Sequence, residues 1–263
     1  MAFEYKLPPS LQKRLEGLQA QTDSIGRSAA TVTVFDDCVL KISPITEENR
    51  NALQMLSWLQ GRLPVPKILY QEDRDGINYL LMSRASGRMA CDPLLMADPL
   101  QLTRSLADAL QTLWRVDITG CPCRQFLEHK LSLATKFVEV GECDMEDAEP
   151  GTYGPGGFRD PEHLLSWLVD NKPEETPVLS HGDFCLPNVF FRDGQVSGYI
   201  DLDHCGIGDP YQDIALCYRS LNHNFNGKYG HFPGYDPKML FQALGMEPDM
   251  DRIRYYILLD ELF

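Results

Sequence analysis

The sequence predicts an α+β protein in which a small antiparallel sheet precedes a larger, mainly helical part. Two observations carry this prediction: apolar and polar residues alternate in the first third of the chain, and apolar residues recur at helical spacing in the rest. We place the boundary at residues 83–87, which gives an N-terminal lobe of residues 1–84 and a C-terminal lobe of residues 85–263. No apolar run approaches the length that spans a bilayer.

Two hairpins are expected in the N-terminal lobe. Residues 30–35 alternate, two aspartates form a turn, and residues 38–43 return. A second pair of apolar runs flanks the turn sequence DRDG at residues 73–76. Between the hairpins, Thr46 is expected to cap a helix. The apolar face of that helix comprises Ala52, Leu53, Met55, Leu56 and Leu59.

Helices dominate the predicted C-terminal lobe. Four leucines at helical spacing mark the first, namely Leu102, Leu106, Leu110 and Leu113. Asp160 followed by Pro161 marks the start of a second helix that runs through Leu168. Two more are expected from apolar residues at 214–221 and 253–259. Residues 141–157 are acidic and then rich in Gly and Pro, so we expect a loop there.

The net charge of the chain indicates which kinds of partner it can bind. The formal net charge is −14, which disfavours nucleic acid and anionic membrane surfaces and suits a cationic small ligand, although solubility alone also explains it. The first residues carry charges and lack the apolar segment of a secretory signal. The eight cysteines include no CxxC pair, so we expect reduced thiols in a cytoplasmic protein. Four of them lie in apolar segments and are expected to be buried: Cys38, Cys185, Cys205 and Cys217.

One segment carries the groups that phosphoryl transfer requires. In HGDFCLPN, Asp183 and Asn188 are separated by four residues, and a predicted hairpin then returns the chain to Asp201. Asp183 can accept a proton from a hydroxyl, while Asn188 and Asp201 offer the oxygen ligands that Mg²⁺ prefers. Each of these residues alone is common in turns, but the ordered set indicates phosphoryl transfer. We interpret His181 as a brace for this loop.

The N-terminal lobe offers groups that can contact phosphates. The small-residue turn SIGRSAATV at residues 24–32 contains Ser28, but its single glycine makes it no Walker loop. Lys41 is the one cation in an apolar strand. It either faces solvent or is the phosphate-binding lysine of a kinase-like lobe.

At this point the whole chain resembles the aminoglycoside 3'-phosphotransferases, or kanamycin kinases, which have a two-lobed protein-kinase-like fold. The blocks that carry the resemblance are WLQGRLPVPKIL, LLMSRASG, HGDFCLPN, GYIDLDHCGIGDPYQDIALCYRS and the terminal YYILLDELF, in the family's order. The resemblance implies a cytoplasmic antibiotic-resistance kinase. Its members transfer the γ-phosphoryl group of ATP or GTP to the 3'-hydroxyl of aminoglycosides such as kanamycin and neomycin.

The resemblance also implies roles for individual residues. Asp183 would be the catalytic aspartate, Asn188 and Asp201 would hold Mg²⁺, and Lys41 would meet the α- and β-phosphates. The remaining nucleotide-binding residues would be Ser28 in a positioning loop and Met82, Ser83 and Ala85 in the linker that meets adenine. The aminoglycoside would be held by the acidic residues Asp144, Glu146, Asp147 and Glu261 and by the terminal carboxylate of Phe263.

Three positions depart from the family's pattern. Ala52 stands where a helix glutamate pairs with the strand lysine, so either Glu48 takes that role or the pair is lost. Val39 replaces an aromatic residue that stacks on adenine, which makes GTP use possible. Asp203 replaces a glycine and either adds a carboxylate near the metal or faces solvent.

Two other functions stay open at this stage. One is a kinase of another small alcohol, such as a macrolide, choline or a sugar. The other is a nucleotide-binding pseudoenzyme, which the missing helix glutamate favours and the intact aspartates disfavour. The chain is expected to be a monomer or a homodimer.

Overall fold

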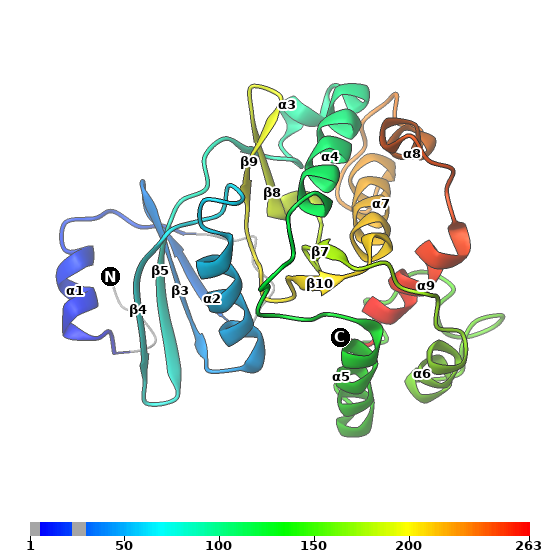
Figure 1. Ribbon diagram of the computed structural model, residues 1–263, viewed down its shortest axis with the longest axis horizontal. Helices are drawn as coiled ribbons and strands as arrows, with labels where there is room; N and C mark the ends of the chain where they lie inside the picture. Colours follow the sequence, from blue (N-terminus) through cyan, green and yellow to red (C-terminus); the bar gives the residue numbers. More distant parts are fainter. Residues whose placement is uncertain (1–5, 23–29) are drawn as a thin grey trace.

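The computed structural model of the protein describes residues 6–22 and 30–263 and contains both helices and strands. Figure 1 shows a small sheet with two helices at one end of the molecule and most of the helices at the other. The predicted α+β class is therefore confirmed. Ser28 lies outside the described residues.

The small sheet is antiparallel throughout, with strand order β1-β2-β3-β5-β4. Its strands are β1 (Gln21–Thr22), β2 (Thr31–Val34), β3 (Cys38–Pro44), β4 (Ile68–Arg74) and β5 (Ile77–Ser83). Both predicted hairpins are present, as β2–β3 and β4–β5. The second turns at Asp75 and Gly76, which both have positive φ, as a tight hairpin turn requires.

The two helices of this region pack on opposite faces of the sheet. On one face, α1 (Pro9–Leu15) places Leu11 and Leu15 against Leu40 and Ile42 of β3. On the other, α2 (Glu47–Leu59) belongs to a core that extends into the helical part of the molecule. Because side chains alternate along a strand, Lys41, which lies between Leu40 and Ile42, points away from α1. Thr46 caps α2 as predicted, in a reciprocal box with Asn49.

The chain leaves the five-stranded sheet at a short linker. β5 ends at Ser83, and β6 (Arg88–Met89) joins a second sheet with β8 (Val189–Arg192) and β9 (Gln195–Tyr199). Gly87 closes the linker at φ +97°, where a Cβ atom would lie 2.3 Å from the Phe191 carbonyl oxygen. Only glycine fits this approach.

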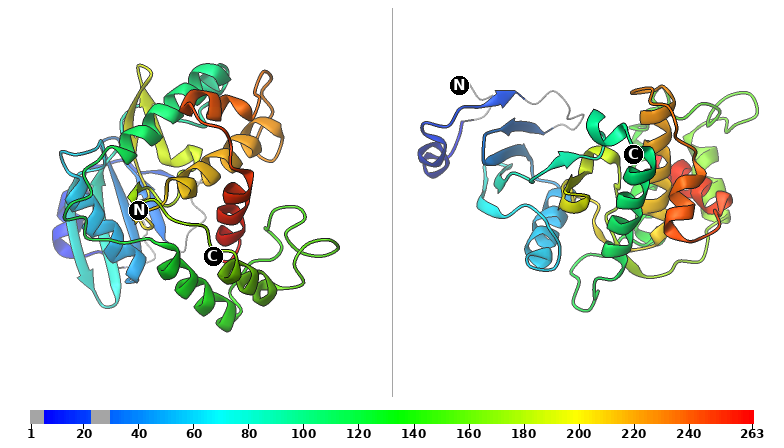
Figure 2. Two further views of the ribbon diagram at one scale, coloured as in Figure 1. Left: turned by 45° about the vertical axis from the view of Figure 1, so that its right-hand side comes forward. Right: turned by 90° about the horizontal axis from the view of Figure 1, so that it is seen from above.

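The helical part is built around α4 and α7, and Figure 2 shows it from two further sides. Its helices are α3 (Pro93–Met96), α4 (Pro99–Trp114), α5 (Leu127–Val140), α6 (Pro161–Asp170), α7 (Pro210–Asn226), α8 (Lys238–Leu244) and α9 (Met250–Asp260). The predictions of α4, α6, α7 and α9 are confirmed, whereas α3, α5 and α8 were not predicted. Residues 142–157 contain no helix or strand, as expected of a loop.

All eight cysteines are free thiols. Cys38, Cys205 and Cys217 are buried as predicted, but the prediction for Cys185 is wrong because it is only partly buried. Cys185 lies in the loop next to Asp183. Within the described residues, no helix is both long enough and apolar enough to cross a membrane.

Candidate active site

Two chain segments meet at the centre of the site, the 181–188 loop and the 201–205 segment. The loop follows β7 (Val178–Ser180), and the segment precedes β10 (Gly206–Gly208), which pairs antiparallel with β7. The two backbones touch at Gly182, where φ is +84° and a Cβ atom would lie 2.0 Å from the His204 carbonyl oxygen. The glycine of the HGD sequence is therefore required by this contact.

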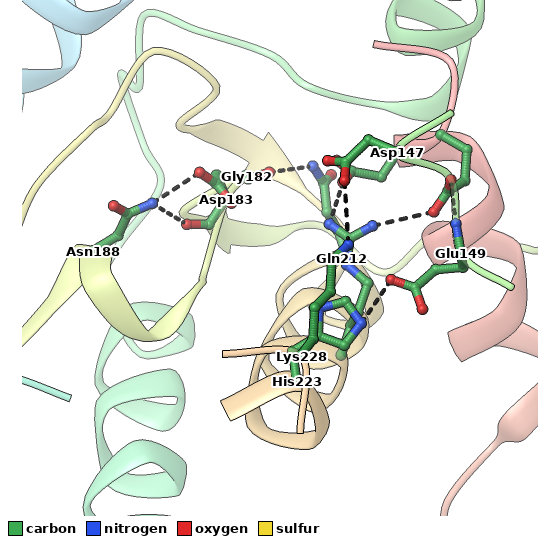
Figure 3. Close-up of polar contacts among 11 residues, drawn as sticks. Asp147, Glu149, Gly182, Asp183, Asn188, Gln212, His223 and Lys228 are labelled. Atoms are coloured by element: carbon green, nitrogen blue, oxygen red, sulfur yellow. Dashed lines mark hydrogen bonds and ion pairs between the residues drawn. The ribbon is translucent and has the colours of Figure 1, made fainter. Parts of the chain in front are cut away.

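Two residues of α7, Asp213 and Gln212, hold the 181–188 loop by hydrogen bonds, and neither role was predicted from the sequence. The Asp213 carboxylate is buried and accepts hydrogen bonds from Ser180 Oγ and from the backbone N–H groups of His181 and Gly182, each at 3.0 Å. Gln212 Nε2 donates to the Gly182 carbonyl at 2.9 Å, as Figure 3 shows. The sequence feature that could have identified these two residues was a Gln-Asp pair on the apolar face of a helix.

Within the loop, Asn188 and Asp183 are joined directly. The Asn188 amide nitrogen donates to Asp183 Oδ2 at 2.8 Å and to the Asp183 carbonyl at 3.0 Å (Figure 3). Burial raises the pKa of the Asp183 carboxyl, and a hydrogen bond from Cys185 opposes this shift. His181 Nδ1 accepts the Asp183 N–H at 3.3 Å, and burial lowers the pKa of its imidazole. A neutral, buried His181 that supports the loop agrees with its interpretation as a brace.

Asp201 lies beside this pair and has an unusual backbone. The Ile200 N–H donates to the Asn188 carbonyl at 3.0 Å, so the predicted hairpin does return the chain to Asn188. Among the described residues other than glycine, positive φ occurs only at Asp75, Asp193 and Asp201. The first two lie in hairpin turns, but Asp201, at φ 57°, does not. Strained backbone of this kind concentrates at functional sites.

The oxygen atoms of Asn188 and Asp201 suit a magnesium ion. Asn188 uses its amide nitrogen toward Asp183, which leaves its Oδ1 atom as an acceptor, and the Asp201 side chain is 47% exposed. The described residues hold no group of three or more His, Cys, Asp or Glu side chains that could bind a metal ion. Two oxygen ligands are enough for Mg²⁺, because this ion keeps several waters and shares the oxygens of bound phosphates.

Lys41 reaches the 201–205 segment from β3. Its ammonium lies 2.8 Å from Asp203 Oδ2 and 3.3 Å from Asp201 Oδ1. Burial acts to lower the pKa of Lys41, but the two carboxylates outweigh it and the pKa is raised. For each of these residues the sequence left two alternatives open. The ion pairs exclude solvent-facing, unpaired side chains: Lys41 points to the two aspartates, and Asp203 points to Lys41. Among the described residues, the partners of Lys41 are these two aspartates and Glu48 is not one of them.

Of the other predicted nucleotide residues, Met82, Ser83 and Ala85 lie at or just beyond the end of β5. Met82 of β5 is the register partner of Val39, two residues before Lys41 on β3. Ser83 exchanges hydrogen bonds with Lys67, through its backbone N–H and its hydroxyl. Ala85 follows in the linker, where its Cβ atom lies against Gly198 of β9.

The three predicted carboxylates of the acidic loop have different surroundings. Asp144 is exposed and accepts the backbone N–H groups of Glu146 and Asp147 at 2.9 and 3.3 Å, so it shapes the loop. Glu146 is exposed. Asp147 lies 3.4 Å from the Lys228 ammonium, as Figure 3 shows.

The end of α9 meets this loop through Glu261. Its carboxylate is buried and accepts the Glu149 N–H at 2.9 Å, while Arg219 of α7 contacts both it and Asp260. Burial raises the pKa of Glu261 to about 7. The Glu149 side chain lies 2.7 Å from His223 Nε2 (Figure 3). Glu149, Arg219 and His223 were not predicted, because only the fold brings them to the chain terminus.

The last residue packs between α5 and the same loop. Phe263 is 40% exposed as a residue, and its ring lies edge-on to that of Phe137 of α5, with centroids 5.6 Å apart. The Cys143 thiol donates to the Leu262 carbonyl at 3.4 Å. Residues 262 and 263 therefore lie next to α5 and the acidic loop.

The sequence and the fold are both similar to those of known phosphotransferases. Residues 19–255 match the phosphotransferase enzyme family. An aminoglycoside 3'-phosphotransferase of Enterococcus faecalis is 34% identical over 98% of each chain, and one of Staphylococcus aureus is 33% identical over the same share. A crystal structure of a type VIII aminoglycoside-3'-phosphotransferase superposes with a TM-score of 0.83 at 25% identity and 97% coverage of both chains. The chain therefore belongs to the phosphotransferase enzyme family.

Proposed function

We propose that this protein is an antibiotic-resistance kinase that transfers the γ-phosphoryl group of ATP to the 3'-hydroxyl of aminoglycosides such as kanamycin and neomycin. The observation that carries the proposal is the meeting of Asp183, Asn188 and Asp201 with Lys41 of the facing sheet. The full-length similarity to aminoglycoside 3'-phosphotransferases supports the choice of acceptor. We also propose that residues 1–84 and 85–263 act as the two lobes of a protein-kinase-like fold, with the nucleotide bound between them.

Asp183 is the residue that handles the proton. Its carboxylate, oriented by the Asn188 amide, accepts the proton of the substrate hydroxyl as that oxygen attacks the γ-phosphorus. The bond from the γ-phosphorus to the bridging oxygen breaks in the same transfer, and ADP leaves. Burial raises the pKa of Asp183, which makes the carboxylate a better proton acceptor. The neutral His181 ring and Asp213 keep the loop in place during this step. Most of the catalysis is positioning and charge stabilisation.

Lys41 and the linker hold the nucleotide. The Lys41 ammonium binds the α- and β-phosphates, and the backbone of Met82, Ser83 and Ala85 meets the adenine edge. Ser28, which lies outside the described residues, contributes to phosphate positioning in this proposal. Asn188 and Asp201 would hold Mg²⁺, which would neutralise the negative charge of the phosphates.

The acidic surface beside the site binds the ammonium groups of the antibiotic. Asp144, Glu146 and Asp147 supply the loop carboxylates, and Glu261 and the Phe263 carboxylate supply the chain terminus. Charge attraction of this kind is strongest where solvent is partly excluded, as it is at Glu261.

Nucleotide turnover with a panel of acceptors tests the proposal. ADP release is expected with kanamycin and neomycin and not with choline or without acceptor, and the kanamycin product should carry phosphate at the 3'-oxygen by NMR. Lividomycin A lacks that hydroxyl, so its turnover would reveal a second site of attack. Asp183→Asn should lower turnover by at least about a hundredfold while ATP affinity measured by calorimetry stays near wild type. Choline phosphorylation, or equal loss of turnover and ATP binding, would contradict the assignment.

A further inference from the structure

The strand lysine of this protein has an unusual counter-ion. Lys41 makes its shorter ion pair with Asp203, at 2.8 Å, and its longer one with Asp201, at 3.3 Å. The Asp203 side chain is 20% exposed, less than half the 47% of Asp201. The better-shielded pair is the stronger one, because water screens it less.

The helix that faces Lys41 supplies no carboxylate to it. Ala52 of α2 is buried and apolar, and the Glu48 carboxylate bonds the Thr46 side chain at the start of the helix. Instead, α2 is fastened to the 201–205 segment by the amide of Asn51. Its Nδ2 atom donates to the carbonyls of Asp203 and Cys205, at 2.8 and 2.9 Å.

Asn51 therefore fixes the position of the Asp203 backbone. The Cys205 N–H closes the same turn by donating to the Leu202 carbonyl at 3.1 Å. Because the backbone of Asp203 is held by α2 and its carboxylate is held by Lys41, the three elements α2, β3 and the 201–205 segment are linked through one residue. In this chain the Asn51 amide and Asp203 together connect α2 to Lys41, in place of a direct ion pair between the helix and the lysine.

We propose that Asp203 is the positioning residue for Lys41, and that it keeps its bond to the ammonium when ATP binds. This inference rests on the proposed function. An ammonium has three donors, so Lys41 can keep Asp203 and still offer two N–H groups to phosphate oxygens. Asp201 is the partner that Lys41 releases, since it is the more exposed and the more distant of the two.

Substitution of Asp203 tests this role. Asp203→Asn keeps the size of the side chain and removes its charge, and Asp203→Gly removes the side chain. Both are expected to weaken binding of MgATP, measured by calorimetry without acceptor, by about tenfold, because a charge-assisted hydrogen bond that orients Lys41 is lost. In turnover, the KM for ATP should rise by a similar factor while the KM for kanamycin stays unchanged. Asp203→Glu should recover part of the ATP affinity.

The matched control is Glu48→Gln, which changes a carboxylate on α2 that does not contact Lys41 and should leave ATP affinity at the wild-type value. Thermal unfolding of each variant verifies that the fold is intact. Unchanged or tighter ATP binding in Asp203→Asn would overturn the inference, since Asp203 would then compete with the phosphates for Lys41. A wild-type protein that binds ATP but does not phosphorylate kanamycin would refute the proposed function alone, because the binding measurement stands without an acceptor.

Discussion

Single residues of the same type behave differently at this site because their surroundings differ. Asp183 is buried beside Asn188, and burial raises its pKa. Asp201 is half exposed and sits on strained backbone. Asp203 is shielded and paired with Lys41. Three of the four aspartates in residues 183–203 therefore supply a proton acceptor, a metal ligand and a counter-ion, as we propose.

Glu261 should release a proton when kanamycin binds. Burial raises its pKa to about 7, so near neutral pH about half of the protein holds this carboxyl protonated. An ammonium group nearby favours the charged carboxylate and lowers the pKa. Calorimetry in two buffers with different ionisation enthalpies gives the number of protons released. We expect a larger number for wild type than for Glu261→Gln, because the variant has no carboxyl proton to release at this position. Equal numbers would show that Glu261 does not sense the ligand.

The same shift makes folding depend on pH. Between the usual Glu pKa of 4.5 and about 7, the folded state keeps a proton that the unfolded state has lost. The free energy of unfolding therefore falls as pH rises through this window, as far as Glu261 is concerned. Glu261→Gln should flatten the dependence in that range.

At the scale of elements, the contact between the 181–188 loop and the 201–205 segment is the most constrained. We predict that Gly182→Ala destabilises the protein by about 3 kcal/mol or more and abolishes turnover, because the added methyl group would lie 2.0 Å from the His204 carbonyl oxygen. Chemical denaturation and the turnover assay measure the two effects.

Gly120→Ala is the matched control for this prediction. Gly120 also has positive φ, at 73°, but no atom lies within 4 Å of its Cβ position. Its substitution should cost only the backbone strain, about 1 kcal/mol, and leave turnover intact. Similar losses at the two glycines would mean that backbone conformation, and not the contact with His204, explains Gly182.

Elements with a strong local signal could be predicted from the sequence, and those defined by distant contacts could not. The β4–β5 hairpin combines apolar alternation with Asp75-Gly76, and α6 combines Asp160 with Pro161. In contrast, α5 begins after Phe126 without a side-chain cap, so its start carries no signal. β10 is a strand of three residues, Gly206–Gly208, that forms only because β7 lies beside it.

The residues of the candidate site also fall into those with a local sequence signal and those that only distant contacts bring together. Asp183, Asn188 and Asp201 could be predicted because a short motif and one hairpin connect them. The Lys41–Asp203 pair spans 162 residues of sequence, and the Glu149–Glu261 contact spans 112. No local pattern specifies such pairs, since they depend on how the sheet, α2 and α9 are packed.

At the scale of the whole molecule, the net charge of −14 should act on the two proposed substrates in opposite directions. An aminoglycoside is a polycation, so the field of the protein raises its rate of encounter, whereas ATP is an anion and is repelled. Raising the ionic strength shortens the range of both effects, from about 10 Å at 0.1 M to about 3 Å at 1 M.

We therefore predict that added NaCl raises the KM for kanamycin, by about tenfold between low and high salt, while the KM for ATP stays constant or falls. Steady-state turnover with one substrate saturating and the other varied measures each constant, and KCl should give the same result as NaCl if the effect is screening. The opposite signs are the internal control, because a general inhibition by salt would raise both constants together. Such a parallel rise would mean that the acidic surface contributes solubility and not recognition of the antibiotic.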